Sequence, residues 1–554
     1  MTADIVTADR QKVAVVTGGG GGIGAAVAAE LGRGGWFVVT VDPLVTLDGS
    51  ARLPAPEETT AGHIRAAGGS ARASSVSVTD GDALHELFLE LADERGGLDA
   101  VVNVAGITRP TTFAKGSEED WLAVLSVHLG GYLNVLEAAL PIMAAAGHGR
   151  ILGVTSGSGW RSADAGAYSC AKRAVAALTW QLGRCMPAGV TVNAMSPIAA
   201  TRMVTEALER ARRASAAAGR TPGTGGLSLS SMPAPDDLGP IGAHLAGDGF
   251  GWCNGRVLFA GGSEVAVIDE PRLLEVVRTG GVASLAALLQ AVVPGALSPA
   301  EAAQGTTGGG NPRFGAIFDE PVAAAVPGAP VRSCAVVSDR PGLAALVTTA
   351  LESRSVLCHT VEMEGGFGDA VKRLNAIVDA GGPLDAVVVA PSGGEPAGSG
   401  GPEWESVLAS HRGIVERLHA DAAWARAAAE YAAEKDHPVR LVTLTDGRTP
   451  GGSSRAQASA QLARAAATST GGRVAGFAVS LEAAEEAAGS AAAELVAYLL
   501  GTPDSGLAGA ELVVDADWLG LRSHPRPIGS VIYGGPTVPG WLDRALRNIT
   551  GVKS

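Results

Sequence analysis

A tyrosine and a lysine four residues apart, Tyr168 and Lys172, have the types and spacing needed for proton transfer. The stretch from Ala167 to Cys185 has a helical pattern, and side chains four apart lie on one face of a helix. An ammonium ion beside a phenol stabilises the phenolate and lowers the pKa of tyrosine from about 10. Such a phenol can act as a general acid or base near neutral pH. The alternative is an ordinary surface pair at helical spacing.

A glycine run near the N-terminus has the context of a dinucleotide site. The β-rich run Val13–Val16 enters Gly18–Gly24, a helical pattern follows, and a second strand, Trp36–Val41, ends in Asp42. Glycines allow a close approach to a pyrophosphate, and the helix N-terminus directs free N–H groups at the anion. A carboxylate at Asp42 would bond a ribose hydroxyl and repel a 2′-phosphate, which favours NAD over NADP. In isolation, the run could be a flexible linker and Asp42 a solvated acid.

Strands and helical patterns alternate along the first half of the chain. This order predicts right-handed crossovers and a parallel, doubly wound α/β sheet of the Rossmann type. The loops at Gly18–Gly24, Ala105–Gly106, Ser156–Gly159 and Ser196–Thr201 would then share the carboxyl edge, where such sheets bind ligands. Asn254–Gly262 is expected to be the last strand of this unit, and the polar stretch 199–235 a lid.

Four motifs in order resemble the short-chain dehydrogenase/reductase family: TGGGGGIG (17–24), NVAG (103–106), Ser156 and YSCAK (168–172). The resemblance covers roughly residues 10 to 270. It implies that Tyr168 is the acid/base, that Lys172 lowers its pKa and holds the ribose, and that Ser156 orients the substrate oxygen. The cofactor contacts it implies are Gly18, Gly22, Ile23, Gly24, Asp42, Asn103, Ala105, Gly106, Tyr168, Lys172 and Thr201.

The chain departs from the family pattern at several positions. Ser156 lies twelve residues before Tyr168 rather than thirteen, where Thr155 stands, and Ser158 is a further alternative. His128 replaces the usual asparagine of the proton relay, and it is either a relay group or a packed histidine. A similar Val-His-Leu stretch occurs in peroxisomal multifunctional β-oxidation enzymes. The acid expected near adenine is replaced by Ser77.

The second half repeats the first without its chemistry. LDAVVVAPSG (384–393) matches LDAVVNVAG, and VRLVTLTDG (439–447) matches GRILGVTSG. On this alignment Tyr168 becomes Ala458 and Lys172 becomes Leu462, while the glycine loop becomes SDRPG (338–342). We therefore predict a catalytic domain at 1–296, a linker at 297–332 and a degenerate, non-catalytic Rossmann-like domain at 333–554.

Composition restricts the partners. The formal net charge of −14 over 554 residues argues against a nucleic-acid or anionic membrane partner. The five cysteines lack metal-ligand spacing, so no metal is expected, and they are typical of a reducing cytoplasm. The second unit could occupy a partner's place, so that two chains would form a homodimer that imitates a four-unit assembly of the family. The tail 523–554 would pack on the protein or cover a neighbouring site.

The leading hypothesis is an oxidoreductase that transfers a hydride between a secondary alcohol, or a 3-hydroxyacyl-type substrate, and NAD. One alternative is a polyketide-type or acyl-thioester ketoreductase that uses NADPH. An alternative of another class is a non-enzymatic nucleotide-binding scaffold, which would have no need of an activated phenol.

Overall fold

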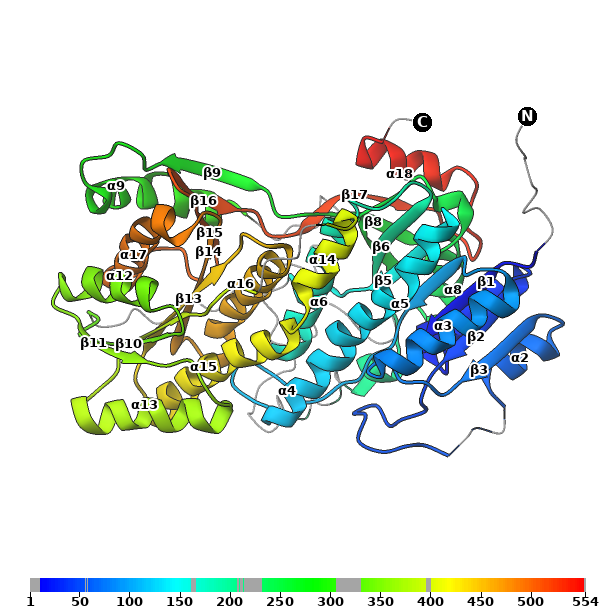
Figure 1. Ribbon diagram of the computed structural model, residues 1–554, viewed down its shortest axis with the longest axis horizontal. Helices are drawn as coiled ribbons and strands as arrows, with labels where there is room; N and C mark the ends of the chain where they lie inside the picture. The colour runs from blue at the N-terminus through cyan, green and yellow to red at the C-terminus, as the bar shows by residue number, and fades with distance from the viewer. Residues whose placement is uncertain are drawn as a thin grey trace.

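Two β-sheets, each flanked by helices, lie side by side in a computed structural model of the chain (Figure 1). The structure describes residues 10–54, 56, 58–160, 166–206, 209, 213, 232–304, 330–394 and 400–552. One sheet has nine strands in the order β17-β8-β7-β6-β5-β4-β1-β2-β3, and the other has eight in the order β11-β10-β12-β13-β14-β15-β16-β9. Both sheets are predominantly parallel, and the predicted fold class is confirmed.

The first sheet has its glycine loop between β1 and the helix that follows it. Its strands are β1 (Val13–Thr17), β2 (Phe37–Val41), β3 (Ser70–Ser74), β4 (Ala100–Asn103), β5 (Gly149–Val154), β6 (Val190–Pro197), β7 (Val257–Gly261), β8 (Glu264–Asp269) and β17 (Arg526–Ile532). Its main helices are α1 (Gly22–Arg33), α2 (Thr60–Ala66), α3 (Gly81–Arg95), α4 (Glu118–Leu125), α5 (Gly131–Ala146), α6 (Gly166–Leu182), α8 (Gly239–Leu245) and α18 (Leu542–Thr550).

The second sheet repeats this order without a counterpart of β3. Its strands are β10 (Ser333–Ser338), β11 (Leu357–Val361), β12 (Ala386–Ala390), β13 (Val439–Asp446), β14 (Val474–Leu481), β15 (Glu511–Val514), β16 (Trp518–Arg522) and β9 (Leu273–Arg278). Its main helices are α9 (Leu285–Val292), α10 (Ser298–Ala302), α12 (Pro341–Glu352), α13 (Phe367–Gly381), α14 (Glu403–His411), α15 (Ile414–Glu434), α16 (Pro450–Thr470) and α17 (Glu485–Gly501).

Strand register agrees with the sequence repeat. Ala100 of β4 pairs with Arg150 of β5, and their counterparts Ala386 and Arg440 pair in the second sheet. An aspartate at the foot of each sheet also makes the same bond. Asp99 accepts from the backbone N–H of Val13, and Asp385 accepts from that of Ser333. The strand pairing and these hydrogen bonds therefore agree with the sequence alignment that places Ala458 opposite Tyr168.

The two units exchange their outermost strands. After β8 the chain crosses to the second sheet, where β9 pairs antiparallel with β16. After β16 it crosses back, and β17 pairs antiparallel with β8 (Figure 1). The sheets therefore cross the predicted domain boundaries at 296 and 333. The expectation that Asn254–Gly262 would hold the last strand was wrong, because an open sheet edge accepts a further strand through its unpaired backbone groups.

The two crossing segments are bonded to one another. Ser523 donates its backbone N–H to the carbonyl of Arg272 at 2.7 Å, and Arg272 donates its N–H to the Ser523 hydroxyl at 3.0 Å. Beyond the crossing, α18 contacts β17 and β8 of the first sheet, while α9 contacts α17 of the second. The C-terminal tail thus packs on the first unit.

Helices from both units meet in a shared core. Helix α6 packs against α16, and α4 and α5 contact α15 and α14. One hydrophobic cluster includes Trp121 and Leu125 of the first unit and Trp424 of the second. The faces of α4, α5 and α6 that contact the second unit, and the edge of β7 that pairs with β8, are covered within one chain. A homodimer of chains stays a prediction and would require other surfaces.

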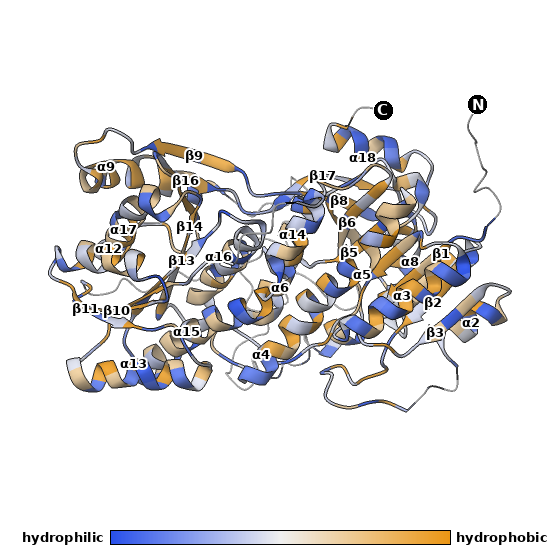
Figure 2. Cartoon of the chain, in the orientation of Figure 1, coloured by the Kyte–Doolittle hydropathy of each residue, from blue (hydrophilic) through white to orange (hydrophobic). Residues whose placement is uncertain are grey.

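By length and composition, two helical stretches could cross a membrane, Glu118–Ala146 and Leu285–Ala302. Helices that pack in a protein core pass the same test, and Glu118–Ala146 runs through the contact between the units. Figure 2 shows apolar residues distributed over the sheets and along strand β9, whose Leu274 and Val276 side chains are exposed.

Candidate active site

The glycine loop turns tightly at the carboxyl end of β1. Gly18 has φ of +65°, in the left-handed region that favours glycine. A Cβ atom on Gly18 would lie 2.8 Å from the backbone nitrogen of Ala105, and one on Gly24 would lie 2.2 Å from the carbonyl oxygen of Gly18. Side chains are therefore excluded at both positions, because the loop packs directly on the backbone after β4.

The next glycines face open space at the start of α1. A Cβ on Gly22 would meet only Thr201, at 3.9 Å, and one on Gly21 only the Arg202 guanidinium, at 3.5 Å. Gly21 caps α1 without a side-chain hydrogen bond, and the first turn contains no acidic residue. Ile23 points into the core. Free N–H groups, a helix N-terminus and a nearby cation fit a dinucleotide pyrophosphate.

Asp42 lies beside this loop, at the end of β2. Its carboxylate accepts from the N–H of Gly20 at 3.0 Å and from that of Leu44 at 2.9 Å. Within the described parts of the chain, no lysine or arginine forms an ion pair with Asp42. No cation of the described chain therefore pairs with this carboxylate, which lies at the position expected for a ribose-binding acid.

Tyr168 and Lys172 lie together on α6. The Lys172 ammonium is 5.7 Å from the centroid of the Tyr168 ring, within cation–π range. Its Nζ donates to the carbonyl of Val154, at the end of β5, at 2.6 Å. Lys172 is buried, and burial lowers its pKa to about 7. A lysine in this state changes charge near neutral pH, beside the phenol.

His128 lies on the other side of the tyrosine. The two rings meet edge to face, with centroids 4.9 Å apart and planes at 87°. His128 belongs to a π-helical turn, Ser126–Gly130, between α4 and α5, and such turns are frequent at functional sites. Its Nε2 lies 2.8 Å from the carbonyl oxygen of Ile107, and Nδ1 has no partner among the described residues. Burial, then the Lys172 charge, lowers the pKa of His128 to about 3, so the imidazole is neutral.

The three candidate hydroxyls differ in their partners. Thr155 is buried and donates to the carbonyl of Lys172 at 2.6 Å, which ties the end of β5 to α6. Ser156 is partly exposed and accepts from the backbone N–H of Ser158 at 3.3 Å. The Thr155 hydroxyl is therefore engaged in a bond that stabilises the fold. Ser156 and Ser158 lie on the loop that follows β5, and the Ser156 hydroxyl makes only a weak contact within that loop.

The NVAG segment supports the loop from below. The Thr17 hydroxyl donates to the Asn103 side chain at 2.7 Å and accepts from the N–H of Ala105 at 3.3 Å. A Cβ on Gly106 would lie 2.5 Å from His128 Cε1, so this glycine leaves room for the imidazole. Asn103 thus joins β1 to β4 in a buried contact.

Several other predictions concern residues outside this group. Ser77, which stands where the family pattern expects an acid near adenine, bonds with the Thr79 hydroxyl, and the nearby Asp80 caps α3 by accepting from the N–H of Ala83. Most of the predicted lid, residues 207–208, 210–212 and 214–231, lies outside the described residues, as does 161–165 before Tyr168. Among the described residues no cluster of histidine, cysteine and acidic groups could hold a metal ion.

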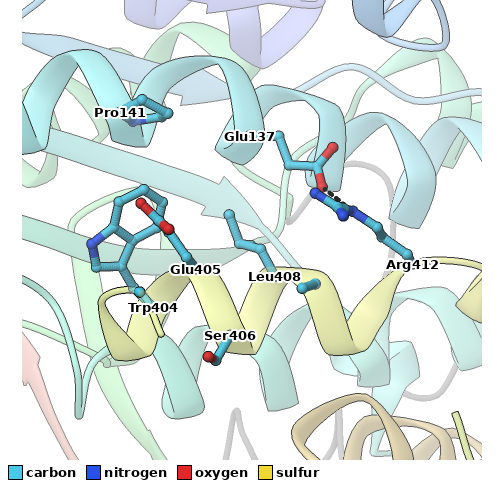
Figure 3. Close-up of a pocket in the computed structure, with 9 residues that line it drawn as sticks. Glu137, Pro141, Trp404, Glu405, Ser406, Leu408 and Arg412 are labelled. Atoms are coloured by element: carbon cyan, nitrogen blue, oxygen red, sulfur yellow. Dashed lines mark hydrogen bonds and ion pairs between the residues drawn. The ribbon is translucent and has the colours of Figure 1, made fainter. Parts of the chain in front are cut away.

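A cavity of about 420 Å³ lies elsewhere, between α5 and α14. Figure 3 shows Glu137 on α5 bonded to Arg412 at the end of α14, with Trp404 and Leu408 along the cavity. The ion pair spans 3.3 Å and joins the two units. No predicted site residue lines this cavity, so the chemistry of the chain is not located there.

Arg202 is the residue that sequence reasoning missed. It follows Thr201, at the start of a helical segment after β6, yet its guanidinium reaches Gly21, which is 181 positions earlier. Its position directly after Thr201 was a signal, but only the sheet edge brings the two loops together.

Comparisons with known proteins agree with this geometry. Residues 12–212 match the family described as short chain dehydrogenase. The chain is similar to the short-chain reductase protein NovJ of Streptomyces niveus, with 37% identity over 37% of this chain and 76% of that protein. It is also similar to an acetoacetyl-CoA reductase of Allochromatium vinosum, with 32% identity over 45% of this chain and 96% of that protein. A peroxisomal hydratase-dehydrogenase-epimerase of Neurospora crassa is 32% identical over 35% of this chain and 21% of that protein.

The fold and the site define a nicotinamide-dependent oxidoreductase. The chain belongs to the short-chain dehydrogenase/reductase family, whose members bind NAD or NADP.

Proposed function

We propose that the first unit catalyses reversible, NAD-dependent oxidation of a secondary alcohol of the 3-hydroxyacyl thioester type. The observation that carries the proposal is the grouping of Tyr168, Lys172 and His128 at the sheet edge that also holds the glycine loop. A phenol flanked by a buried lysine and a neutral histidine suits proton transfer.

In this proposal Tyr168 takes the proton of the substrate hydroxyl, and Ser156 holds the substrate oxygen. Lys172, in its charged form, stabilises the phenolate that precedes this transfer. A bound nicotinamide would supply the acceptor for the hydride of the carbinol carbon, so that the alcohol, after giving its proton to Tyr168, would become a ketone. His128 Nδ1, which has no partner among the described residues, is available to hold a water molecule in the path of the proton.

The cofactor would lie across the glycine loop. Gly18 and Gly24 keep the loop close to β4, and the N–H groups at Gly22 and Ile23 would face the pyrophosphate. Arg202 would neutralise that anion, and Thr201 would contact the nicotinamide end. Asp42 supports NAD over NADP, because a carboxylate at the end of β2 bonds a free ribose hydroxyl and repels a 2′-phosphate.

The substrate class is supported by the names of relatives and by one residue. Acetoacetyl-CoA reductases and peroxisomal hydratase-dehydrogenase-epimerases are among the similar proteins. His128 stands in the Val-His-Leu stretch that resembles the peroxisomal enzymes. A thioester with a hydroxyl at carbon 3 offers the secondary alcohol that the tyrosine requires.

The second candidate is a ketoreductase that uses NADPH, which the reductases among the relatives favour. One assay separates the candidates. The purified full chain is incubated with 3-hydroxybutyryl-CoA and NAD or NADP, and with acetoacetyl-CoA and NADH or NADPH, while nicotinamide absorbance is followed. We expect turnover with the NAD pair. Turnover confined to NADPH would replace the proposal with the second candidate, and nucleotide binding without turnover on any secondary alcohol would favour a scaffold.

A further inference from the structure

The second unit touches the catalytic loop of the first. The Gln461 side chain, on α16, donates from Nε2 to the carbonyl oxygen of Ser158 at 3.1 Å, across 303 positions of sequence. Gln461 is 3% exposed. Ser158 lies in the short turn Gly157–Gly159, directly after the Ser156 hydroxyl. A side chain of the half without catalytic groups therefore holds the loop that carries the substrate-binding hydroxyl.

Further bonds fix the catalytic helix to the same partner. The Cys170 thiol donates to the carbonyl of Ala458 at 3.6 Å, two residues from Tyr168. Arg173, next to Lys172, forms a buried ion pair with Glu511 of β15 at 2.8 Å. The second unit thus holds helix α6 within its Tyr-x-x-x-Lys segment, at Cys170, and directly after it, at Arg173.

The repeat places Gln461 opposite Ala171, the residue before the catalytic lysine. The second unit has lost the tyrosine and lysine at the neighbouring positions, where Ala458 and Leu462 stand. A buried glutamine has no role in an apolar helix contact, because desolvating its amide is costly unless the amide is hydrogen-bonded. Here the bond is made to a backbone group of the other unit's site.

We propose that Gln461 is a positioning residue for the reaction of the first unit, and that the second unit acts as an internal partner that completes the active site. The expected change in kcat rests on the proposed function, whereas the bracing of the turn does not. Without the amide donor, the Ser158 carbonyl loses its partner, the turn shifts, and the Ser156 hydroxyl leaves the line between substrate and Tyr168.

The test compares Gln461→Met with the control Gln181→Met in the full chain. Methionine keeps a similar length and volume and removes the donor. Gln181, on α6, also bonds across the contact between units, from Nε2 to the Ser454 hydroxyl at 3.1 Å, but it does not touch the loop. Each variant loses an amide hydrogen bond between the units, and only Gln461→Met loses the bond to the catalytic turn.

We expect Gln461→Met to lower kcat about tenfold, the effect of about one lost hydrogen bond to a part-buried group. NAD affinity, measured by calorimetry, and the melting temperature should match those of Gln181→Met. Hydrogen–deuterium exchange should increase in the peptide that covers residues 156–160 in Gln461→Met alone.

The exchange measurement needs no substrate, so it separates this inference from the proposed function. If the wild-type chain turns over no secondary alcohol but exchange rises selectively, the proposed function fails and the bracing of the turn stands. If exchange and kcat in Gln461→Met equal those of Gln181→Met, the inference is overturned.

Discussion

The two units repeat one strand order and use the same sheet edge in opposite ways. At the edge of the first sheet, a Cβ on Gly21 or Gly22 would fit without a clash, and the nearest groups are the Arg202 guanidinium and the Thr201 methyl group, respectively. At the matching edge of the second sheet, Arg340 donates to Glu485 at 2.9 and 3.1 Å. A Cβ on Gly342 would lie 2.3 Å from the carboxylate of Glu485. That glutamate occupies the space above the second loop.

Further side chains close the second edge. Arg455 forms a buried pair with Asp421 at 2.7 Å and donates to the carbonyl of Ser392. Ser392 in turn donates to Asp339. The charged groups of this edge form ion pairs with one another, although Arg340 Nη1 and the Thr445 and Ser480 hydroxyls have no partner within the described chain. At the first edge, Asp42 and Arg202 form no ion pair with any described residue, so their charges stay available to a ligand.

Removing the phenol hydroxyl of Tyr168 should have the largest effect on turnover, because the first unit then lacks the acid/base group that the second unit also lacks. We expect Tyr168→Phe to lower turnover about 10³-fold, the usual contribution of a positioned acid/base. NAD affinity and melting temperature should change little, since the ring is kept. Turnover equal to that of the wild type would contradict the assignment of Tyr168.

Lys172→Met should separate catalysis from stability. We expect turnover to fall about 10²-fold, because the phenolate loses its cation. The pKa of Lys172 is lowered from 10.5 to about 7, so between these values the unfolded chain binds a proton that the folded chain does not. Stability therefore rises with pH through this window, and the full penalty is present at pH 7 and below.

The methionine variant lacks that penalty. We expect it to be more stable than the wild type at pH 7, by on the order of 2 to 4 kcal/mol. Chemical denaturation of both proteins at pH 7 and pH 10 measures the difference, which should narrow at the higher pH. If the variant is less stable than the wild type at pH 7, burial of the Lys172 ammonium does not reduce the free energy of unfolding, and the prediction is wrong.

The carboxylate of Asp42 tests the choice of cofactor. We expect Asp42→Ala to weaken NAD binding about tenfold, through the loss of charge-assisted bonds to the ribose. The preference for NAD over NADP should fall by at least as much. Asp48→Ala, in the loop that follows β2, is the control because the Asp48 carboxylate bonds, among the described residues, to Thr46 and Ser50 of the same loop. Equal NAD affinity in both variants would exclude the ribose contact.

The guanidinium of Arg202 should have a smaller effect on the same binding. We expect Arg202→Ala to weaken NAD binding about fivefold at low ionic strength, and less at high salt, since mobile ions screen an exposed charge pair. Arg33→Ala, at the opposite end of α1, removes an equal charge and is the control. A loss that is the same in both variants would reflect overall charge rather than contact.

A substitution at the edge of the second unit should have the smallest effect on nucleotide binding. Arg340→Ala breaks the pair with Glu485, and we expect a loss of about 1 to 2 kcal/mol in unfolding free energy. Calorimetry should still find one NAD per chain. A second NAD site in this variant would show that the ion pair alone blocks the second edge.

The sequence by itself predicted the candidate residues at the edge of the sheet and the repetition of the fold. Glycine spacing, Asp42 and the interval from Tyr168 to Lys172 are local, because backbone turns and helix faces depend on neighbours. The repeat of LDAVV predicted a second sheet whose register agrees with that of the first. Periodicity and spacing carry these features without reference to distant contacts.

Only the tertiary structure decided which groups were already bonded and which were available. Thr155 and Ser156 are neighbours with similar side chains, and the difference lies in the bond from Thr155 to Lys172, 17 positions away. The strand exchange was hidden because backbone hydrogen bonds pair any compatible edge. The contact of Arg202 with Gly21 and the bond of Gln461 to Ser158 join residues that are far apart in the sequence. The glycine loop is thus encoded in the sequence, while the contact of Arg202 with that loop and the bond of Gln461 to Ser158 depend on tertiary packing.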